Sequence, residues 1–169
     1  MKFDGKIIMV FGGTGTIGSA LVEYLLKTDI KTIRIFSNDE NSLWETQQRF
    51  GNHKLRYLLG DIRNLERVKR SLKRVDYVFN CAAIKHVPFA EYNPMEAVSV
   101  NIKGLSNVID GCIYNDVEKL LHISTDKVCY VTCIMGATKL IGESLLQMRS
   151  AQNPKVDMVC VRSGNVLDS

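Results

Sequence analysis

The sequence lacks any long apolar run. No stretch of its 169 residues approaches the roughly eighteen consecutive apolar residues that a membrane-spanning helix needs. The opening MKFDGK has no apolar segment of the kind found in a signal peptide. Linkers and low-complexity segments are absent as well. We therefore expect one cytoplasmic domain over residues 1–169, without a membrane partner.

Cysteine pairing motifs are also missing. The five cysteines are odd in number and form no CxxC, and the three histidines are scattered along the chain. Cys129 and Cys133 would face each other on a helix, but a zinc site needs two further ligands. We expect no metal site and no disulfide framework, and we place most of the thiols in the core.

The excess of positive over negative charge is small, with a net charge of only +4. Residues 63–74 carry much of the basic excess, but no aromatic residues interleave there to stack bases. We interpret this stretch as a solvated helix face, with a polyanion-binding patch as the alternative. No nucleic-acid partner is expected.

The composition that remains, 46% apolar and 24% charged, is that of a globular domain. Short apolar runs alternate with helical patterns along the whole chain. We predict strands at residues 6–11, 32–36, 55–59, 76–80, 119–124 and 157–161. We predict helices at residues 17–27, from after 36 to about 50, and at 65–75, 94–115 and 134–149.

Strands that are apolar throughout and separated by helices indicate a parallel sheet covered on both faces. We predict a Rossmann-like, doubly wound α/β domain that stops after about the sixth strand. Before the fourth of these helices, Asn93 is predicted to be the N-cap, with Pro94 at the first helical position and Glu96 reaching back to the cap.

A glycine-rich loop directly follows the first predicted strand and opens the first helix. It satisfies both GxGxxG and GxxGxxG, and its residues are Gly12, Gly13, Thr14, Gly15, Thr16, Ile17 and Gly18. Glycine permits the tight turn and lets backbone N–H groups approach a pyrophosphate at the helix N-terminus. We predict a dinucleotide site, with a purely structural turn as the alternative.

The residues after the second strand normally choose between NAD and NADP. An acidic residue there binds the ribose 2′-hydroxyl, and an arginine accepts a 2′-phosphate. This chain has Ser37, Asn38 and Asp39. The choice of cofactor stays open on these residues alone.

Several further motifs occur in a fixed order. Besides the glycine loop, they are GDIR at 60–63, AAIKHVP at 82–88, EYNP at 91–94, STDK at 124–127, GATK at 136–139 and GNV at 164–166. Together they resemble the extended short-chain dehydrogenase/reductases, specifically the UDP-N-acetylglucosamine 4,6-dehydratase (5-epimerase) group of the capsular polysaccharide biosynthesis family. The resemblance covers essentially the whole chain.

This resemblance implies positions for the cofactor and the substrate. Asp61 and Ile62 would lie at the adenine, and Ala82 and Ala83 along the cofactor. Lys85 would approach the nicotinamide or the substrate. His86 and Thr125 are further implied substrate-binding residues.

The resemblance also implies a reaction. Hydride leaves sugar C4 for NAD(P)⁺, the ketone acidifies the C5 proton, and hydride returns to C6. Lys127 would be the base at C5, which requires a lowered pKa, and Asp126 would protonate the departing C6 hydroxyl, which requires a raised one. An exposed ion pair without chemistry is the alternative for these two residues.

Lys139 is implied to bind the nicotinamide ribose. Four residues earlier, most short-chain dehydrogenases have a tyrosine, but this chain has Met135, which cannot exchange a proton. A branch of the family carries methionine there, so Met135 does not by itself imply an inactive enzyme. The alternatives are a hydrophobic residue that fills the space and, as a substitute base, Tyr130.

Other positions depart from the family pattern. Val131 and Cys133 replace a proline and an asparagine, and Ser163 replaces an aromatic residue. Asn38 replaces an arginine, which weakens the NADP assignment without establishing NAD. The resemblance as a whole slightly favours NADP.

Family members run to roughly twice this length, with most of the sugar-nucleotide pocket in the additional part. We therefore expect a truncated or split dehydratase that is inactive alone and leaves apolar sheet surface uncovered. It would bind a UDP-sugar only with the missing half supplied, by a C-terminal partner chain for example, and a homo-oligomer is a further expectation. The alternatives are a non-catalytic dinucleotide-binding module and a decayed gene product.

Overall fold

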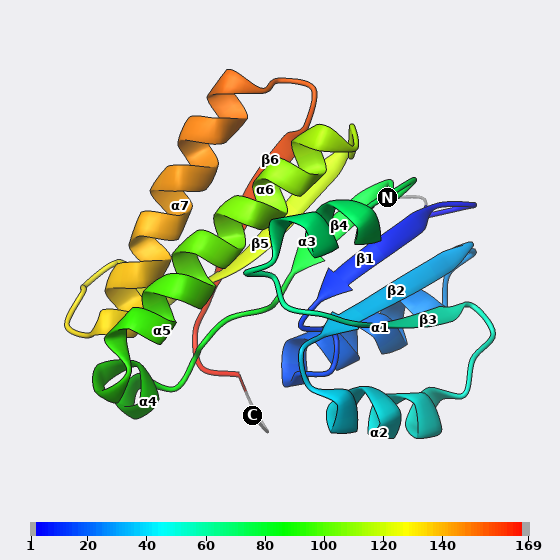
Figure 1. Cartoon of the computed structure of the whole chain (residues 1–169), viewed down its shortest axis with the longest axis horizontal. Helices are drawn as coiled ribbons and strands as arrows, with labels where there is room; N and C mark the ends of the chain where they lie inside the picture. The colour runs from blue at the N-terminus through cyan, green and yellow to red at the C-terminus, as the bar shows by residue number, and fades with distance from the viewer. Residues whose placement is uncertain (1–2, 167–169) are drawn as a thin grey trace.

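A computed structural model describes residues 3–166, and six strands of this region form one parallel sheet (Figure 1). The order in the sheet is β3-β2-β1-β4-β5-β6. The strands are β1 (Ile7–Phe11), β2 (Thr32–Ser37), β3 (Leu55–Leu59), β4 (Tyr77–Asn80), β5 (Lys119–Thr125) and β6 (Asp157–Ser163). The prediction of a Rossmann-like, doubly wound α/β fold is confirmed.

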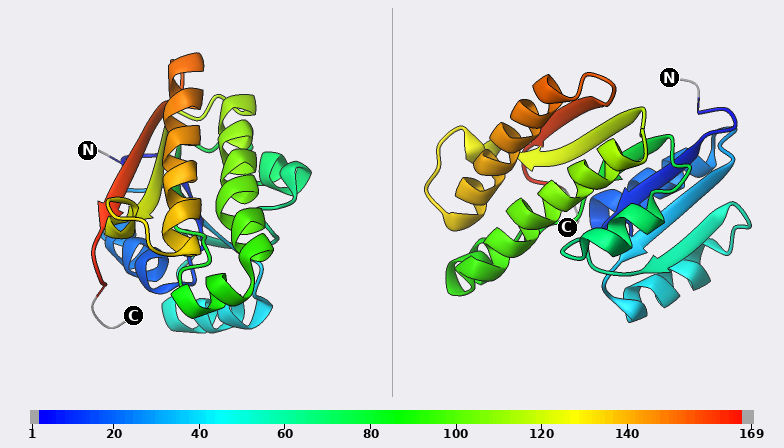
Figure 2. Two further views of the ribbon diagram at one scale, coloured as in Figure 1. Left: turned by 90° about the vertical axis from the view of Figure 1, so that its left-hand side faces the viewer. Right: turned by 45° about the horizontal axis from the view of Figure 1, so that its top comes forward.

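Helices cover both faces of this sheet (Figures 1 and 2). They are α1 (Thr16–Leu26), α2 (Glu40–Phe50), α3 (Leu65–Ser71), α4 (Val87–Tyr92), α5 (Pro94–Val98), α6 (Leu105–Tyr114) and α7 (Ile134–Gln152). A π-helical segment, Ser99–Gly104, joins α5 to α6, and a 3₁₀ turn, Asp126–Val128, follows β5. Helices α1 and α2 pack on one face, and α3, α6 and α7 pack on the other.

The central strand β1 shows why the strands are apolar throughout. Ile8 and Val10 point into the cluster formed with α1 and α2, whereas Met9 and Phe11 point into the cluster formed with α3, α6 and α7. All four side chains are fully buried. A strand covered on both sides has no position left for a polar side chain.

The segment around Asn93 differs from the prediction. Helix α4 ends immediately before it, and the Asn93 Nδ2 atom donates to the carbonyl oxygen of Phe89 at 3.1 Å instead of capping the next helix. Glu96 binds Arg63 rather than reaching back. Asn93 does stand at the N-cap position of α5 and Pro94 begins that helix, as predicted. The predicted side-chain cap is wrong, because α4 ends at Asn93 and the Asn93 side chain bonds back to it.

The cysteines are less buried than predicted. Only Cys112 is fully buried among the five, and Cys129 is exposed. Cys129 follows the 3₁₀ turn and Cys133 is the N-cap of α7, so the two do not share a helix. Within residues 3–166 no group of three or more His, Cys, Asp or Glu side chains is arranged to hold a metal ion.

Several side chains of the basic stretch at residues 63–74 form ion pairs or hydrogen bonds within the protein. Arg63 binds Asp61 and Glu96, Arg67 donates to the carbonyl of Leu59, and Lys69 pairs with Glu66. Helix α3 ends at Ser71, short of the predicted residue 75. These partners agree with the helix-face interpretation rather than with a polyanion patch.

One side of β5 and β6 stays exposed. Helices α6 and α7 lie on the same side of these two strands (Figure 2). On the opposite side Val159 and Val161 are 46% and 41% exposed, and Leu121 and Ile123 are half-buried. Within the described residues, no helix is both long and apolar enough to cross a bilayer.

Candidate functional site

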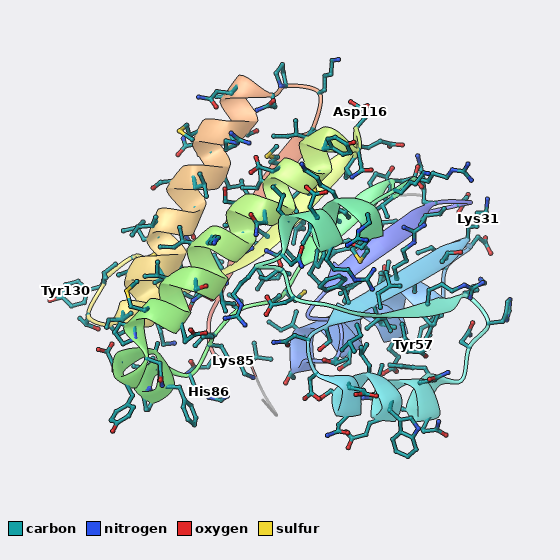
Figure 3. All side chains as sticks on the ribbon, in the orientation of Figure 1. Lys31, Tyr57, Lys85, His86, Asp116 and Tyr130 are labelled. Carbon is teal, nitrogen blue, oxygen red and sulfur yellow. The ribbon has the colours of Figure 1, made fainter. Side chains whose placement is uncertain are left out.

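A cleft of about 740 Å³ lies at the carboxyl ends of β1, β2, β3 and β4. The strand order reverses between β1 and β4, so the loops after these strands leave in opposite directions and open a crevice between them. Most of the lining comes from four segments: the glycine loop, residues 36–39, residues 60–63 and residues 81–86. Further lining residues are Ser42, Phe89, Asn93, Glu96, Val100 and Val166. Figure 3 shows Lys85 and His86 on the β4–α4 segment of this wall.

Three glycines of the loop are required by the protein's own packing. Gly12 has a φ of +70°, and a Cβ there would lie 2.8 Å from the backbone nitrogen of Ala82. A Cβ on Gly13 would meet Ile35 at 2.9 Å, and one on Gly18 would lie 2.2 Å from the Gly12 carbonyl oxygen. Because no Cβ is present at these three positions, the loop can turn tightly between β1 and α1.

Gly15 is different because nothing in the protein demands a glycine there. Its φ is −76°, and a Cβ would meet nothing closer than the Gly12 carbonyl oxygen at 3.5 Å. Gly15 is the N-cap of α1, and no side chain caps this helix. The first-turn N–H groups are therefore left for an anion, and a bare backbone lines the space in front of them. This local arrangement fits a diphosphate.

The residues after β2 form a hydrogen-bonded corner of the cleft. The Ser37 hydroxyl accepts from Thr14 Oγ1 and from the Asp39 backbone nitrogen, both at 3.2 Å. Asp39 caps α2 through the Ser42 backbone nitrogen at 3.2 Å and the Ser42 hydroxyl at 2.6 Å. These bonds hold the pKa of Asp39 below its usual value. Asn38 lies between them, exposed and lining the cleft.

The residues after β3 close the far end. Arg63 donates to Asp61 Oδ2 from Nε at 2.9 Å and from Nη2 at 2.6 Å, and this guanidinium lowers the pKa of Asp61. Arg63 Nη1 also donates to Glu96 Oε2 at 2.9 Å, which joins β3 to α5. Ile62 is 5% exposed and packs against Gly104. The sequence analysis did not find this use of Glu96.

The segment after β4 is held in place by a buried asparagine. Asn101 accepts from the Ile84 backbone nitrogen at 2.9 Å and donates to the Ile84 carbonyl at 3.1 Å. Its amide also donates to the Thr138 hydroxyl at 3.0 Å. Asn101 therefore fixes the backbone beside Ala82 and Ala83, which line the cleft. The sequence analysis missed it because no local motif marks a contact between the π-helical segment and this loop.

Asp126 and Lys127 form an exposed ion pair at the carboxyl end of β5. Their charged atoms lie 3.6 Å apart, and their side chains are 58% and 39% exposed. Thr125 donates to Asp126 Oδ1 at 3.1 Å, and Lys127 Nζ donates to Asn165 Oδ1 at 3.4 Å. None of these residues lines the cleft itself, although they emerge from the same edge of the sheet.

Lys139 and Met135 lie on the inner side of α7, outside the cleft lining. Lys139 is 6% exposed, and its Nζ atom donates to the carbonyl oxygen of Ile123 at 2.7 Å. Burial lowers the pKa of Lys139 to about 8. Met135 is 4% exposed in a cluster with Ala90 and Ala97.

Tyr130 does not take the place of the missing tyrosine. Its side chain is 83% exposed, and it projects from the loop before α7, away from the sheet (Figure 3). Among the predicted cofactor residues, only Gly13 and Lys139 lie outside the cleft, since Gly13 is buried beneath the loop.

The sheet and its glycine loop define the chain as a Rossmann-like α/β domain. Residues 8–169 match the family described as "Polysaccharide biosynthesis protein", and the chain belongs to this family. The family resemblance inferred from the motifs is thus confirmed.

Two relatives illustrate the range within this similarity. The chain is 41% identical to a "UDP-N-acetylglucosamine 4,6-dehydratase (inverting)" of Campylobacter jejuni, over 99% of the chain and 51% of that protein. It is 40% identical to a "UDP-glucose 4-epimerase" of Rickettsia massiliae, again over 99% of the chain and 51% of the relative. The chain spans about half the length of the curated relatives it matches.

Solved structures share the fold. "Pen from Bacillus thuringiensis" superposes with a TM-score of 0.96 at 40% identity, covering 99% of this chain and 52% of that one. "DesIV (dTDP-glucose 4,6-dehydratase) from Streptomyces venezuelae with NAD and TYD bound" superposes with a TM-score of 0.84 at 20% identity, covering 92% and 55%. The second likeness concerns the fold alone.

Proposed function

We propose that residues 1–169 form the NAD(P)-binding domain of a nucleotide-sugar dehydratase that works in surface polysaccharide biosynthesis. The observation that carries this proposal is Gly15. A side chain there fits the protein, yet its absence leaves open space in front of the uncapped N-terminus of α1. A bound dinucleotide would fill that space, because its diphosphate must approach main-chain N–H groups closely. The dehydratase and epimerase relatives are consistent with this class.

In this reaction, the ion pair after β5 would carry out the acid–base steps. A nicotinamide held in the cleft would supply hydride transfer, taking hydride from sugar C4 and returning it at C6. The C4 hydroxyl proton would pass to water or another acceptor, because the Met135 thioether cannot take it. Lys127 Nζ would take the C5 proton and return it to C5 when hydride reaches C6, and the Asp126 carboxyl group would protonate the departing C6 hydroxyl. This chemistry needs a neutral amine and a neutral acid, which differ from the ion pair by one proton passed from Lys127 to Asp126.

The sugar-nucleotide pocket requires additional chain. We infer that a further segment or a C-terminal partner chain packs on the exposed side of β5 and β6, where Leu121, Ile123, Val159 and Val161 offer an apolar surface. Lys85, His86 and Thr125 then face the UDP-sugar from this half. Without the other half, the 169 residues bind cofactor and turn over little substrate.

A second candidate is a dinucleotide-binding module without chemistry. Met135 favours it, because a thioether in an apolar cluster stands where most short-chain dehydrogenases have the tyrosine that exchanges a proton. This candidate predicts dinucleotide binding, a protein partner and no effect of Lys127→Ala.

The test combines binding and turnover. We expect calorimetry to detect binding of NAD⁺ or NADP⁺ by the chain, and its absence would remove both candidates. Mixing the chain with the other half of the Campylobacter jejuni relative and UDP-N-acetylglucosamine should yield a 4-keto-6-deoxy sugar nucleotide. Lys127→Ala should abolish the product and leave dinucleotide binding intact. Cofactor binding without product would favour the non-catalytic module, and product from the chain alone would refute the need for a second half.

A further inference from the structure

We propose that the cleft selects NAD over NADP, with Asn38 and Asp39 placed at the ribose 2′-hydroxyl. The inference rests on the proposed function, since it presumes that a dinucleotide occupies the cleft. It differs from the NADP that the family resemblance favours. Its basis is the distribution of charge at the corner formed by the ends of β2 and β3.

The position of this corner follows from the sheet. Phe11 and Phe36 are register partners in β1 and β2, and the Gly12 backbone nitrogen donates to the Phe36 carbonyl at 2.9 Å. The glycine loop and the residues after β2 therefore leave the sheet side by side. A dinucleotide with its diphosphate on the loop places its adenine ribose at the end of β2. Asn38, Asp39 and Ser42 line the cleft there.

The corner carries negative charge. Asp39 is held ionised by its two bonds from Ser42, and Glu40 adds a second carboxylate in the first turn of α2. These two carboxylates offset the positive end of the α2 dipole, which would otherwise attract a phosphate. A 2′-phosphate carries about −1.5 to −2 charges at neutral pH, by analogy with other phosphate monoesters, and would be repelled here.

No free cation compensates for this charge within the described part of the cleft. Among the lining residues, the lysine and arginine side chains are those of Arg63 and Lys85. The Arg63 guanidinium is already bound to Asp61 and Glu96. Lys85 and His86 follow β4, which β1 separates from β2 by two strand spacings of about 4.8 Å each. Arg67 lies nearer, with its guanidinium 5.8 Å from the Phe36 ring centroid, but it does not line the cleft, and its guanidinium donates to the Leu59 carbonyl from both Nε and Nη2.

A hydroxyl suits the same corner. The Asp39 carboxylate accepts from the Ser42 backbone and hydroxyl and interacts with the Asn41 backbone N–H, and its two oxygens together can accept a further donor. The ribose 2′-hydroxyl donates one hydrogen and matches this acceptor. The exposed Asn38 amide, which has both donors and an acceptor, lies beside it. The corner therefore accepts NAD and disfavours a 2′-phosphate.

The experiment measures the dissociation constants of NAD⁺ and NADP⁺ for the full chain by calorimetry. We expect NAD⁺ to bind at least about tenfold more tightly, the ratio that one hydrogen bond to a charged group provides. NADP⁺ binding as tightly as NAD⁺ or more tightly would overturn the inference and leave the proposed function standing. Failure of both dinucleotides to bind would refute the proposed function as well.

Two variants locate the selectivity. Asn38→Arg supplies a guanidinium for a phosphate and should shift the ratio of affinities toward NADP⁺ by about tenfold or more. Asp39→Ser removes the charge, keeps a residue that caps helices well, and should shift the ratio in the same direction. Gln48→Arg is the matched control, because it adds the same charge two turns along the exposed side of α2 and should leave the ratio unchanged. An equal shift in Gln48→Arg would assign the effect to overall charge and overturn the role of Asn38.

Discussion

Lys139 Nζ donates to the carbonyl oxygen of Ile123 at 2.7 Å and thereby ties α7 to β5. The ammonium group is 6% exposed, and no carboxylate binds it directly in the described region. Burial of this charge opposes folding, so the hydrogen bond holds the lysine in a position that is electrostatically unfavourable at neutral pH.

This burial makes stability depend on alkaline pH. The pKa of Lys139 is about 8 in the folded chain and near 10.5 when unfolded, so between these values the unfolded state binds more protons. The free energy of unfolding of the wild type should therefore rise relative to Lys139→Met as the pH increases from about 8 to 10.5. We expect a relative gain of about 3 kcal/mol at most, measured by urea denaturation at several pH values. A difference that stays constant with pH would contradict this prediction.

The two glycines at the start of α1 should respond differently to substitution. Gly15→Val places its Cβ at an ordinary contact distance of 3.5 Å from the Gly12 carbonyl oxygen, at a φ that any residue adopts. The variant should therefore keep its thermal midpoint and lose dinucleotide binding by at least about tenfold. Gly18→Val would place its Cβ 2.2 Å from the Gly12 carbonyl oxygen, and it should lose stability as well. Calorimetry and thermal unfolding monitored by circular dichroism separate the two effects. Full dinucleotide binding by Gly15→Val would argue against a diphosphate on this loop.

Asn101 should stabilise the wall of the cleft. Asn101→Leu leaves the partly buried N–H and C=O groups of Ile84 without their partner, and we expect a loss of about 2–4 kcal/mol in the free energy of unfolding. Thr138→Val removes the hydroxyl that accepts from Asn101 but keeps both bonds to Ile84. It should therefore lose less, about 1 kcal/mol. Urea denaturation of the two variants measures this order, and a reversed order would refute the proposed positioning role.

Substitutions at Met135 test whether its side chain fills a space too small for a tyrosine. Its side chain packs against Ala90 and Ala97, which are fully buried, so the larger ring of Met135→Tyr should overpack the cluster. We expect a loss of about 1–3 kcal/mol in stability, against less than about 1.5 kcal/mol for the volume-conserving Met135→Leu. If Met135→Tyr were as stable as the wild type, the site would have room for a tyrosine and the hydrophobic-filler interpretation would fail.

The sheet and the glycine loop were predictable because their determinants are local. Residues 6–11 are apolar without interruption and end in glycines, and this pattern alone indicates a strand buried on both faces before a tight turn. The six predicted strands match the structure in number and order, with small differences at their ends. Helix α4 was not predicted, and the helix predicted at 94–115 is divided into α5, a π-helical segment and α6.

The contacts that complete the site were not predictable in this way. Glu96 binds Arg63 from a different element, and Asn101 binds Ile84 across the fold. Asn93 is a residue type that often caps helices, but its side chain bonds to the short helix before it. In each case, the bonds of the side chain depend on a partner distant in sequence or on a helix that was not predicted. The local sequence pattern indicates neither of these.

Strand β6 lies at the margin of the described sheet, where its outer main-chain groups have no neighbouring strand. Val159 and Val161 project next to that margin. An uncapped row of N–H and C=O groups flanked by β-branched side chains is a template onto which another molecule can add a strand. Whatever covers β6 in the cell would therefore also protect the chain from polymerising edge to edge.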